Sequence, residues 1–367
     1  MEILEVKTKK GLKKFIDFPY SLYAKDPLYV PILKREVREQ LTEKNPFFQH
    51  AEAKYFVAND SGKTVGRIAS IVNKRHREFH NEEAGFFGFF ESVNDPDVSG
   101  RLLDAAAQDL KLKGMHIMRG PMNFSTNEEC GFIIEGLDTS PMLMTPYNPL
   151  YYSDLMDQYG LRKVKDLFAY IYYVQETPPE KVARVAVIAQ RRGISVRPIV
   201  KKKFHEEMLV FKEIYNSAWE DNWGFIPLTD AELYYLGERL KQIAVPELTL
   251  IAEDQGRAVG FLGLVPDFNS VLRHMNGRLT PLSVIKALYY ARKITGLRLL
   301  LLGIKREYRN KGVEALLIHE VFKEIKKRGY ERIEFSWVLE ENIPIQRIIE
   351  MADGRLYKKY RIYEKSI

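Results

Sequence analysis

The chain has 367 residues, 46% hydrophobic and 29% charged, a balance that is typical of a soluble globular protein and excludes extensive disorder. No apolar run reaches the length of a membrane span, and the single cysteine, Cys130, excludes an internal disulfide framework and fits a reducing cytoplasm. The net charge of +7 favours an anionic partner, but no motif for binding nucleic acid accompanies it, so we expect no nucleic-acid partner.

The first half of the sequence predicts alternating strands and helices. Apolar residues that alternate indicate strands, whereas apolar residues three or four positions apart indicate helices. The predicted elements are a strand at 1–8, helices near 10–24 and 34–42, a hairpin at 54–72, a strand at 85–92, a helix at 99–113, a strand at 116–123, a helix at 150–159 and a strand at 161–174. A helix at about 178–192 follows.

The second half repeats this order. Residues 58–66 (ANDSGKTVG) and 252–260 (AEDQGRAVG) share one pattern 194 positions apart, and a second similarity lies around Gly160 and Gly354, at the same offset. Two matches at one offset indicate two copies of one fold. We therefore predict domains at 1–175 and 194–367 with a linking helix at 176–193. The second copy is predicted to contain a strand at 194–200, helices at 205–219 and 230–243, a hairpin at 248–265, a strand at 297–304, a helix at 311–327, a strand at 331–338, a short helix and a strand at 355–365, with an extra segment at 270–296.

A candidate phosphate-binding loop lies between the predicted strand at 297–304 and the helix that follows it. It reads Arg309-Asn310-Lys311-Gly312-Val313, and the first turn of a helix offers unpaired N–H groups to a phosphate. With the strand order, this loop resembles the [R/Q]-x-x-G-x-[G/A] loop of the GNAT superfamily of acyl-CoA N-acyltransferases. Glu314 departs from that pattern at the sixth place, where its carboxylate would repel a phosphate unless it points away.

The resemblance covers nearly the whole chain and implies a mixed α/β fold: a tandem duplication of the GNAT fold, each copy with a central mixed sheet flanked by helices. Four further segments are similar to a bacterial group of tandem GNAT proteins related to bacterial ceramide synthases, which implies a fatty acyl donor and a long-chain amine. The four segments are SWVLEEN (336–342), AWEDNWGFIPLT (218–229), PDFN (266–269) and KKYRIYEK (358–365).

In the first copy, residues 91–97 carry three carboxylates in place of the phosphate-binding loop, so we expect one donor site, in the second copy.

The resemblance also implies a co-substrate, acetyl-CoA or a longer acyl-CoA, bound by the second copy. The candidate residues for binding the co-substrate are Gly303, Ile304, Arg309, Asn310, Lys311, Gly312, Val313 and Asn342. For Asn342, the alternative to this role is to cap the helix that begins near Pro344.

Acylation of an amine needs a group that accepts the amine proton and a polarised thioester carbonyl. Glu340 and Asp267 are the candidate bases, and capping of a turn or helix is the alternative for each. The place of the tyrosine that usually protonates the thiolate falls near Ile349. Tyr360 or Tyr363 is the candidate replacement, although tyrosines that alternate on a terminal strand also suit packing.

The resemblance also implies which residues border the acceptor pocket, because in the GNAT fold the connection between the first two helices lies beside it. An aromatic packing cluster is the alternative for the two tryptophans near 220. The segment at 281–295 predicts an amphipathic helix, either a lid over a lipid-like acceptor or an ordinary surface helix. The candidate acceptor residues are Trp219, Asn222, Trp223, Asn269 and Trp337.

We therefore predict a cytoplasmic N-acyltransferase that acylates a primary amine of a small or lipid-like molecule and binds no metal. The alternatives are an aminoacyl-tRNA-dependent peptidyltransferase and a non-catalytic tandem GNAT protein that binds a ligand or partner. The sequence leaves peripheral membrane contact and the oligomeric state open.

Overall fold

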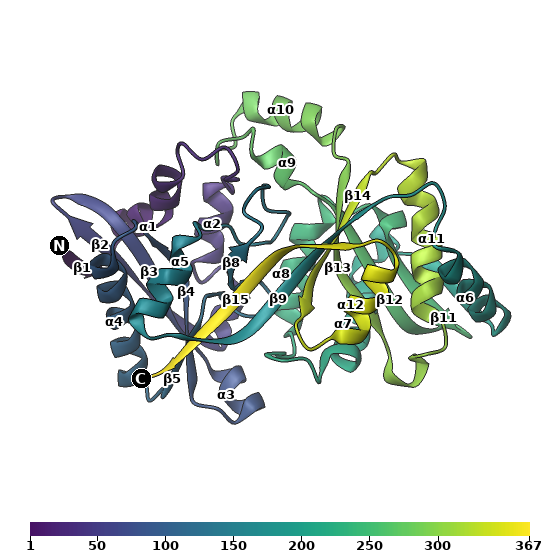
Figure 1. Cartoon of the computed structure of the whole chain (residues 1–367), viewed down its shortest axis with the longest axis horizontal. Helices are drawn as coiled ribbons and strands as arrows, with labels where there is room; N and C mark the ends of the chain where they lie inside the picture. Colours follow the sequence, from purple (N-terminus) through teal and green to yellow (C-terminus); the bar gives the residue numbers. More distant parts are fainter. The chain divides into compact units, whose positions relative to one another are not determined.

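The computed structural model describes all 367 residues, whose contacts divide them into two compact units. The first unit contains Met1–Phe168, Val271–Leu288 and Tyr357–Ile367, and the second contains Ala169–Ser270 and Tyr289–Leu356. Two long strands, β9 (Arg162–Tyr173) and β15 (Arg355–Ser366), have residues in both units (Figure 1). The boundaries predicted near residues 175 and 194 stay a prediction. No helix has both the length and the apolar character needed to cross a bilayer.

A mixed sheet forms the centre of the first unit. Its strands lie in the order β1-β2-β3-β4-β5-β15, and every neighbouring pair is antiparallel except the parallel pair β4–β5. Helix α4 packs its apolar face, with Leu102 and Leu110, into a core that also contains Tyr152 of α5. The bounds are β1 Glu2–Glu5, α1 Lys9–Leu22, α2 Lys34–Gln40, β2 Ala51–Asp60, β3 Lys63–Asn73, α3 Lys74–His80, β4 Ala84–Ser92, α4 Pro96–Leu112, β5 Ile117–Gly120, β6 Met122–Asn123, β7 Glu129–Cys130, β8 Phe132–Glu135 and α5 Tyr151–Tyr159.

The second unit repeats the arrangement, with strands in the order β14-β13-β12-β11-β10 and a single parallel pair, β13–β14. One core cluster joins α6 and α11 to the sheet through residues such as Leu262 and Leu316. A second joins α7 and α8 to the sheet through Phe211 and Phe261. The bounds are α6 Glu180–Arg191, β10 Ile194–Pro198, α7 Phe204–Trp219, α8 Asp230–Lys241, β11 Thr249–Asp254, β12 Arg257–Pro266, α9 Asn269–Leu272, α10 Pro281–Ala291, β13 Gly296–Ile304, α11 Val313–Lys327, β14 Arg332–Leu339 and α12 Ile343–Met351.

The hairpin turns confirm the predicted duplication at the level of the backbone. Ser61 and Gly62 join β2 to β3 with φ angles of 49° and 83°, and Gln255 and Gly256 join β11 to β12 with 49° and 78°. Positive φ at both positions is the geometry of a two-residue hairpin, and glycine adopts it without strain. Helix α3 and the short strands β7 and β8 were not predicted from the sequence, and the strand predicted at 116–123 is divided into β5 and β6.

Ion pairs hold the C-terminal strand β15 in the sheet of the first unit. Arg361 donates two hydrogen bonds to Asp166 on β9, at 2.8 and 2.9 Å. Arg119 on β5 bonds to Glu364 on β15 at 2.9 Å and to Glu82 at 2.8 and 2.9 Å. The last residues of the chain are therefore fastened by charge as well as by the strand ladder.

The Asp166–Arg361 pair predicts a pH-dependent contribution to stability. Burial raises the pKa of Asp166, but hydrogen bonds from Arg361 and Lys163 outweigh it and hold the pKa below 3.8. We expect Asp166→Asn to lower the free energy of unfolding by about 1.5–3 kcal/mol at neutral pH. Because the pKa is lower in the folded state, this loss should shrink as the pH falls below 3.8.

Urea unfolding at neutral and acid pH measures the effect, with the exposed Asp138→Asn as the control. A wild-type free energy of unfolding for Asp166→Asn at neutral pH would contradict the assignment of this pair.

Candidate active site

The parallel strands β13 and β14 separate halfway along their length. Their register runs from the pair Gly296–Arg332 to the pair Leu299–Phe335, and both strands continue beyond it to Ile304 and Leu339. The ladder between β12 and β13 skips Leu300, which marks a β-bulge at the same point. Beyond Leu299, β14 no longer pairs with β13, and an unpaired strand edge is the kind of surface to which an extended ligand can add.

The opening between the strands leads to the candidate phosphate-binding loop. Arg309 and Lys311 are exposed, as are Arg306 and Asn310. Arg309 donates to the carbonyl of Ala218 at 3.0 Å, and the ammonium of Lys311 lies 4.4 Å from the centroid of the Tyr308 ring. Helix α11 begins next, and no side chain caps its first turn. The positive end of a helix and two exposed cations are together suited to a phosphate.

Gly312 at the start of α11 has a structural role that the sequence did not reveal. Its φ angle is 83°, and a Cβ atom at this position would lie 2.8 Å from Cγ1 of Val185 and 3.2 Å from the carbonyl oxygen of that residue, on α6. Glycine is therefore required here for the left-handed conformation and for the packing of α6 against α11.

Glu314 lies in the first turn of α11, at the sixth place of the loop pattern. Its Oε2 atom is buried and has no hydrogen-bond partner. A carboxylate in the first turn is stabilised by the positive end of the helix, so it acts there against the binding of a phosphate.

The equivalent places in the first copy are filled by its own residues. Asp95 Oδ1 accepts from the backbone N–H of Asp97 at 2.9 Å and so caps α4. The strands β4 and β5 also separate, but a Cβ atom at Gly88 would lie 1.8 Å from the carbonyl oxygen of Met122, so backbone fills this gap. Asn123 Oδ1 also accepts from the N–H of Phe89 at 2.7 Å. These contacts support a donor site in the second copy alone.

A buried polar cluster lies where β13 and β14 begin to separate, and it was not predicted from the sequence. Arg298 and Glu334 are paired in register; Arg298 Nε donates to Ser336 Oγ at 2.8 Å, and Ser336 Oγ donates to Glu334 Oε1 at 2.5 Å. The Arg298 guanidinium lies 5.1 Å from the Trp337 ring centroid. Arg298 is the one charged residue in the apolar strand β13, which was the available signal.

The structure brings some of the predicted residues together at the opening. Trp219 packs on β13: a Cβ atom at Gly303 would lie 2.2 Å from Cζ3 of its ring. Trp219 also stacks on Tyr215, at 5.0 Å between ring centroids. Ile304 and Val313 are buried in the core cluster that includes α11. The backbone of Asn222 contacts Trp219, and Trp223 follows it in the same connection.

Other predicted residues lie away from this point. Asp267 and Asn269, each 7% exposed, follow β12, and the N–H of Asp267 bonds to Gly296 at the start of β13. Gly303 lies seven positions after Gly296, about 23 Å along a strand. Asn342 Oδ1 accepts from the N–H of Ile345, 3.4 Å away, as a helix cap.

The two remaining candidates for catalysis lie on other elements. Glu340 follows β14, and its carbonyl accepts from Gln346 at 2.9 Å. Tyr360 is buried on the part of β15 that belongs to the first unit, opposite Ile133 of β8. The catalytic roles of both residues stay predictions.

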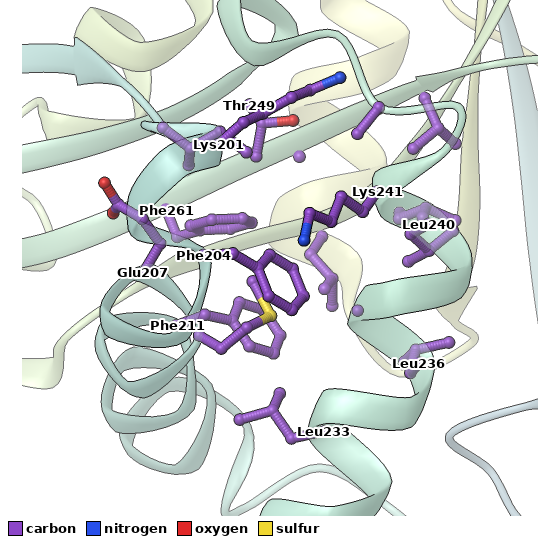
Figure 2. Close-up of a pocket in the computed structure, with 18 of the residues that line it drawn as sticks. Lys201, Phe204, Glu207, Phe211, Leu233, Leu236, Leu240, Lys241, Thr249 and Phe261 are labelled. Atoms are coloured by element: carbon purple, nitrogen blue, oxygen red, sulfur yellow. The ribbon is translucent and has the colours of Figure 1, made fainter.

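An apolar cavity of about 100 Å³ lies between α7, α8 and the sheet of the second unit (Figure 2). Leu301 lines it from β13, two residues before Gly303, so both residues are on the same face of the strand. The Lys241 ammonium lies over the Phe204 ring, 4.3 Å from the ring centroid. The other lining residues labelled in Figure 2 include Phe211, Leu233, Leu236, Leu240, Thr249 and Phe261.

The structure contains no group of three or more His, Cys, Asp or Glu side chains arranged to hold a metal ion. His76 and His80 pack with ring centroids 4.5 Å apart, and His76 bonds to Glu82 at 3.3 Å. Independence from a metal stays a prediction.

The contact of Gly312 with α6 predicts a specific loss of stability. We expect Gly312→Ala to lower the free energy of unfolding more than Gly256→Ala, by about 1–3 kcal/mol, because a close-packed site accommodates added atoms poorly. Gly256 is the matched control, since its φ is 78° and a Cβ atom added there would have no neighbour within 4 Å. Urea unfolding of both variants, and of Gly312→Ala combined with Val185→Ala, measures this. Equal losses at the two glycines would contradict the packing role.

Comparisons with known proteins agree with this geometry. Residues 209–351 match the acetyltransferase (GNAT) family. Protein YghO of Escherichia coli (strain K12) is 34% identical to this chain over 98% of it and 94% of the relative. Bacterial ceramide synthase of Caulobacter vibrioides (strain NA1000 / CB15N) is also 34% identical, over 100% of this chain and 98% of the relative.

Solved structures show the same fold. A tandem GNAT protein from the clavulanic acid biosynthesis pathway matches with a TM-score of 0.60 and 10% identity, over 100% of this chain and 98% of that one. A GCN5-related N-acetyltransferase from Sphaerobacter thermophilus has a TM-score of 0.50 and 16% identity, over 86% and 80%. The chain therefore belongs to the GNAT superfamily, in the tandem-GNAT group that includes protein YghO and bacterial ceramide synthase.

Proposed function

We propose that this protein is an N-acyltransferase that transfers an acyl group from acyl-CoA to the primary amine of a lipid-like acceptor, with the donor bound by the second copy. The GNAT fold and family support an acyltransferase. The observation that carries the finer proposal is the opening between β13 and β14, which leads to the uncapped N-terminus of α11.

The residues around the opening suit the parts of a coenzyme A thioester. The pyrophosphate would bind the N–H groups of α11 with Arg309 and Lys311, and the extended pantetheine would lie along β13. Backbone N–H groups near Gly303 and Ile304 would donate to the thioester carbonyl and stabilise the negative charge that develops on its oxygen.

The reaction also requires proton transfer at both reacting groups. The amine nitrogen forms a bond to the carbonyl carbon, the carbon–sulfur bond breaks, the amine loses a proton and the thiolate gains one. We propose Glu340, which follows β14, as the base that accepts the amine proton, directly or through a water, while the thiolate takes its proton from solvent. Catalytic roles for Asp267 and Tyr360 stay predictions. Arg298, Glu334 and Ser336 would position the backbone where the strands separate.

The apolar cavity supports a substrate with an apolar chain. Its volume of about 100 Å³ is smaller than the ~150 Å³ cavity that holds benzene in another protein, so it has room for a few carbon atoms. The relative named bacterial ceramide synthase adds a fatty acyl donor and a long-chain amine to this proposal. We assign the cavity to the carbon atoms of the acyl chain nearest the thioester, because Leu301 and Gly303 lie on the same face of β13.

The donor site predicts that Lys311→Ala weakens the binding of coenzyme A by about fivefold, because an exposed ion pair contributes up to about 1 kcal/mol. Glu314→Gln should strengthen binding, because it removes a negative charge from the first turn of α11. Isothermal titration calorimetry measures both, with Lys323→Ala on the exposed side of α11 as the control.

An unchanged affinity of Lys311→Ala would contradict the assignment of the loop. If the wild-type protein does not bind coenzyme A, the non-catalytic tandem GNAT alternative is favoured, which Glu314 also supports.

The cavity predicts that affinity rises with the length of a short acyl chain. Butyryl-CoA should bind about tenfold more tightly than acetyl-CoA, since each buried methylene contributes about 0.8 kcal/mol. Ala244 lines the cavity, and we expect Ala244→Phe to abolish this difference while acetyl-CoA binds as before. Calorimetry with both thioesters measures it. A preference for butyryl-CoA that survives in Ala244→Phe would place the acyl chain elsewhere.

A further inference from the structure

Helix α10 presents its apolar side chains to solvent. Leu282, Ile285, Leu288 and Tyr289 are 63%, 65%, 66% and 55% exposed. Their spacing of three and four residues places them along one side of the helix. Leu279, which precedes the helix, is 60% exposed. An amphipathic helix of a soluble domain normally turns this side toward the core, so the orientation of α10 requires an explanation.

The segment that precedes α10 is anchored to the first unit. Val271 and Met275 are buried, and the carbonyl of Gly277 accepts from the N–H of Lys34 at 3.0 Å. Arg273 donates to the carbonyl of Pro27 at 2.8 Å. A Cβ atom at Gly277 would lie 2.4 Å from the Tyr20 ring, which shows how closely this turn packs.

Polar contacts define the start of the helix. The N–H of Ser283 bonds to Thr280 Oγ1 at 3.2 Å, and Ser283 Oγ accepts from the N–H of Thr280 at 2.7 Å. Ser283 is buried, whereas the apolar side chains around it are not. The anchored turn and this cap fix the direction in which α10, labelled in Figure 1, begins.

The segment from 269 to 296 has a net positive charge. It contains no Asp or Glu, and all five of its Arg and Lys residues are exposed. Partial burial and the charges of Arg273 and Lys286 lower the pKa of His274. The five residues are Arg273, Arg278, Lys286, Arg292 and Lys293.

We propose that α10 is an interfacial helix that binds the surface of an anionic lipid bilayer. Leu282, Ile285, Leu288 and Tyr289 would enter the boundary between headgroups and acyl chains, and the five cations would contact anionic headgroups. The charge favours this occupant: a second copy of the chain docked through α10 would bring two sets of five cations together, and residues 269–296 contain no carboxylate to offset them. The inference does not depend on the proposed chemistry.

Flotation with lipid vesicles tests the proposal on the full-length protein. We expect binding to vesicles that contain phosphatidylglycerol, weak binding to vesicles of phosphatidylcholine alone, and a steep loss of binding with added salt. Each of Lys286→Glu, Arg292→Glu and Lys293→Glu should weaken binding about fivefold or more, because a cation near the surface contributes about this factor.

The apolar face is tested by Ile285→Glu combined with Leu288→Glu, which should abolish binding. The matched controls are Leu112→Glu, which changes an 81% exposed leucine on α4, and Lys10→Glu on α1. Thermal unfolding verifies that each variant folds. Wild-type binding by the Ile285→Glu, Leu288→Glu variant, or equal binding to both types of vesicle, would overturn the proposal. So would a dimer that forms through α10 in sedimentation velocity without lipid.

Discussion

The proposed donor site depends on the separation of β13 and β14 after the pair Leu299–Phe335. Parallel strands in a sheet normally satisfy each other's backbone groups along their whole length. Here a β-bulge at Leu300 bends β13 at the point where pairing ends, and both strands continue without each other. A backbone edge is thereby left for a ligand to pair with, beside the N-terminus of α11.

The two copies show how one fold is used in two ways. Both contain a parallel pair of strands that separate, and both have a helix after the first of these strands. In the first copy the chain fills the gap with Met122 and Asn123, and Asp95 caps the helix. In the second copy Gly312 leaves the helix uncapped. Duplication therefore supplies one copy suited to a donor and one whose equivalent places are already occupied.

Local patterns in the sequence predicted much of the fold. The hairpin turns follow from Gly62 and Gly256, because a two-residue turn with positive φ favours glycine. Helix α11 follows from the spacing of its apolar residues and the glycine before it. Capping of a helix was the alternative role predicted for Asn342, and the structure shows this cap on α12.

What the sequence did not predict depends on contacts between distant segments. The Arg298–Glu334 pair needs the register of two strands that are joined through a helix. The contact of Gly312 with Val185 depends on the position of α6. The spacing of apolar residues in α10 predicts a helix with an apolar side, but it does not predict whether that side faces the core or the solvent. Ion pairs such as Asp166–Arg361 join residues from opposite halves of the chain, which no local pattern reveals.

Hydrogen exchange of the backbone amides, measured by mass spectrometry with and without coenzyme A, is the most direct test of a single donor site between β13 and α11. We expect slower exchange in β13 after Leu300 and in the first turn of α11 when coenzyme A is bound, because the ligand would engage N–H groups there. The amides after Asp95 in the first copy should exchange at the same rate in both conditions. Protection at the start of α4, or none along β13 and α11, would contradict a single donor site in the second copy.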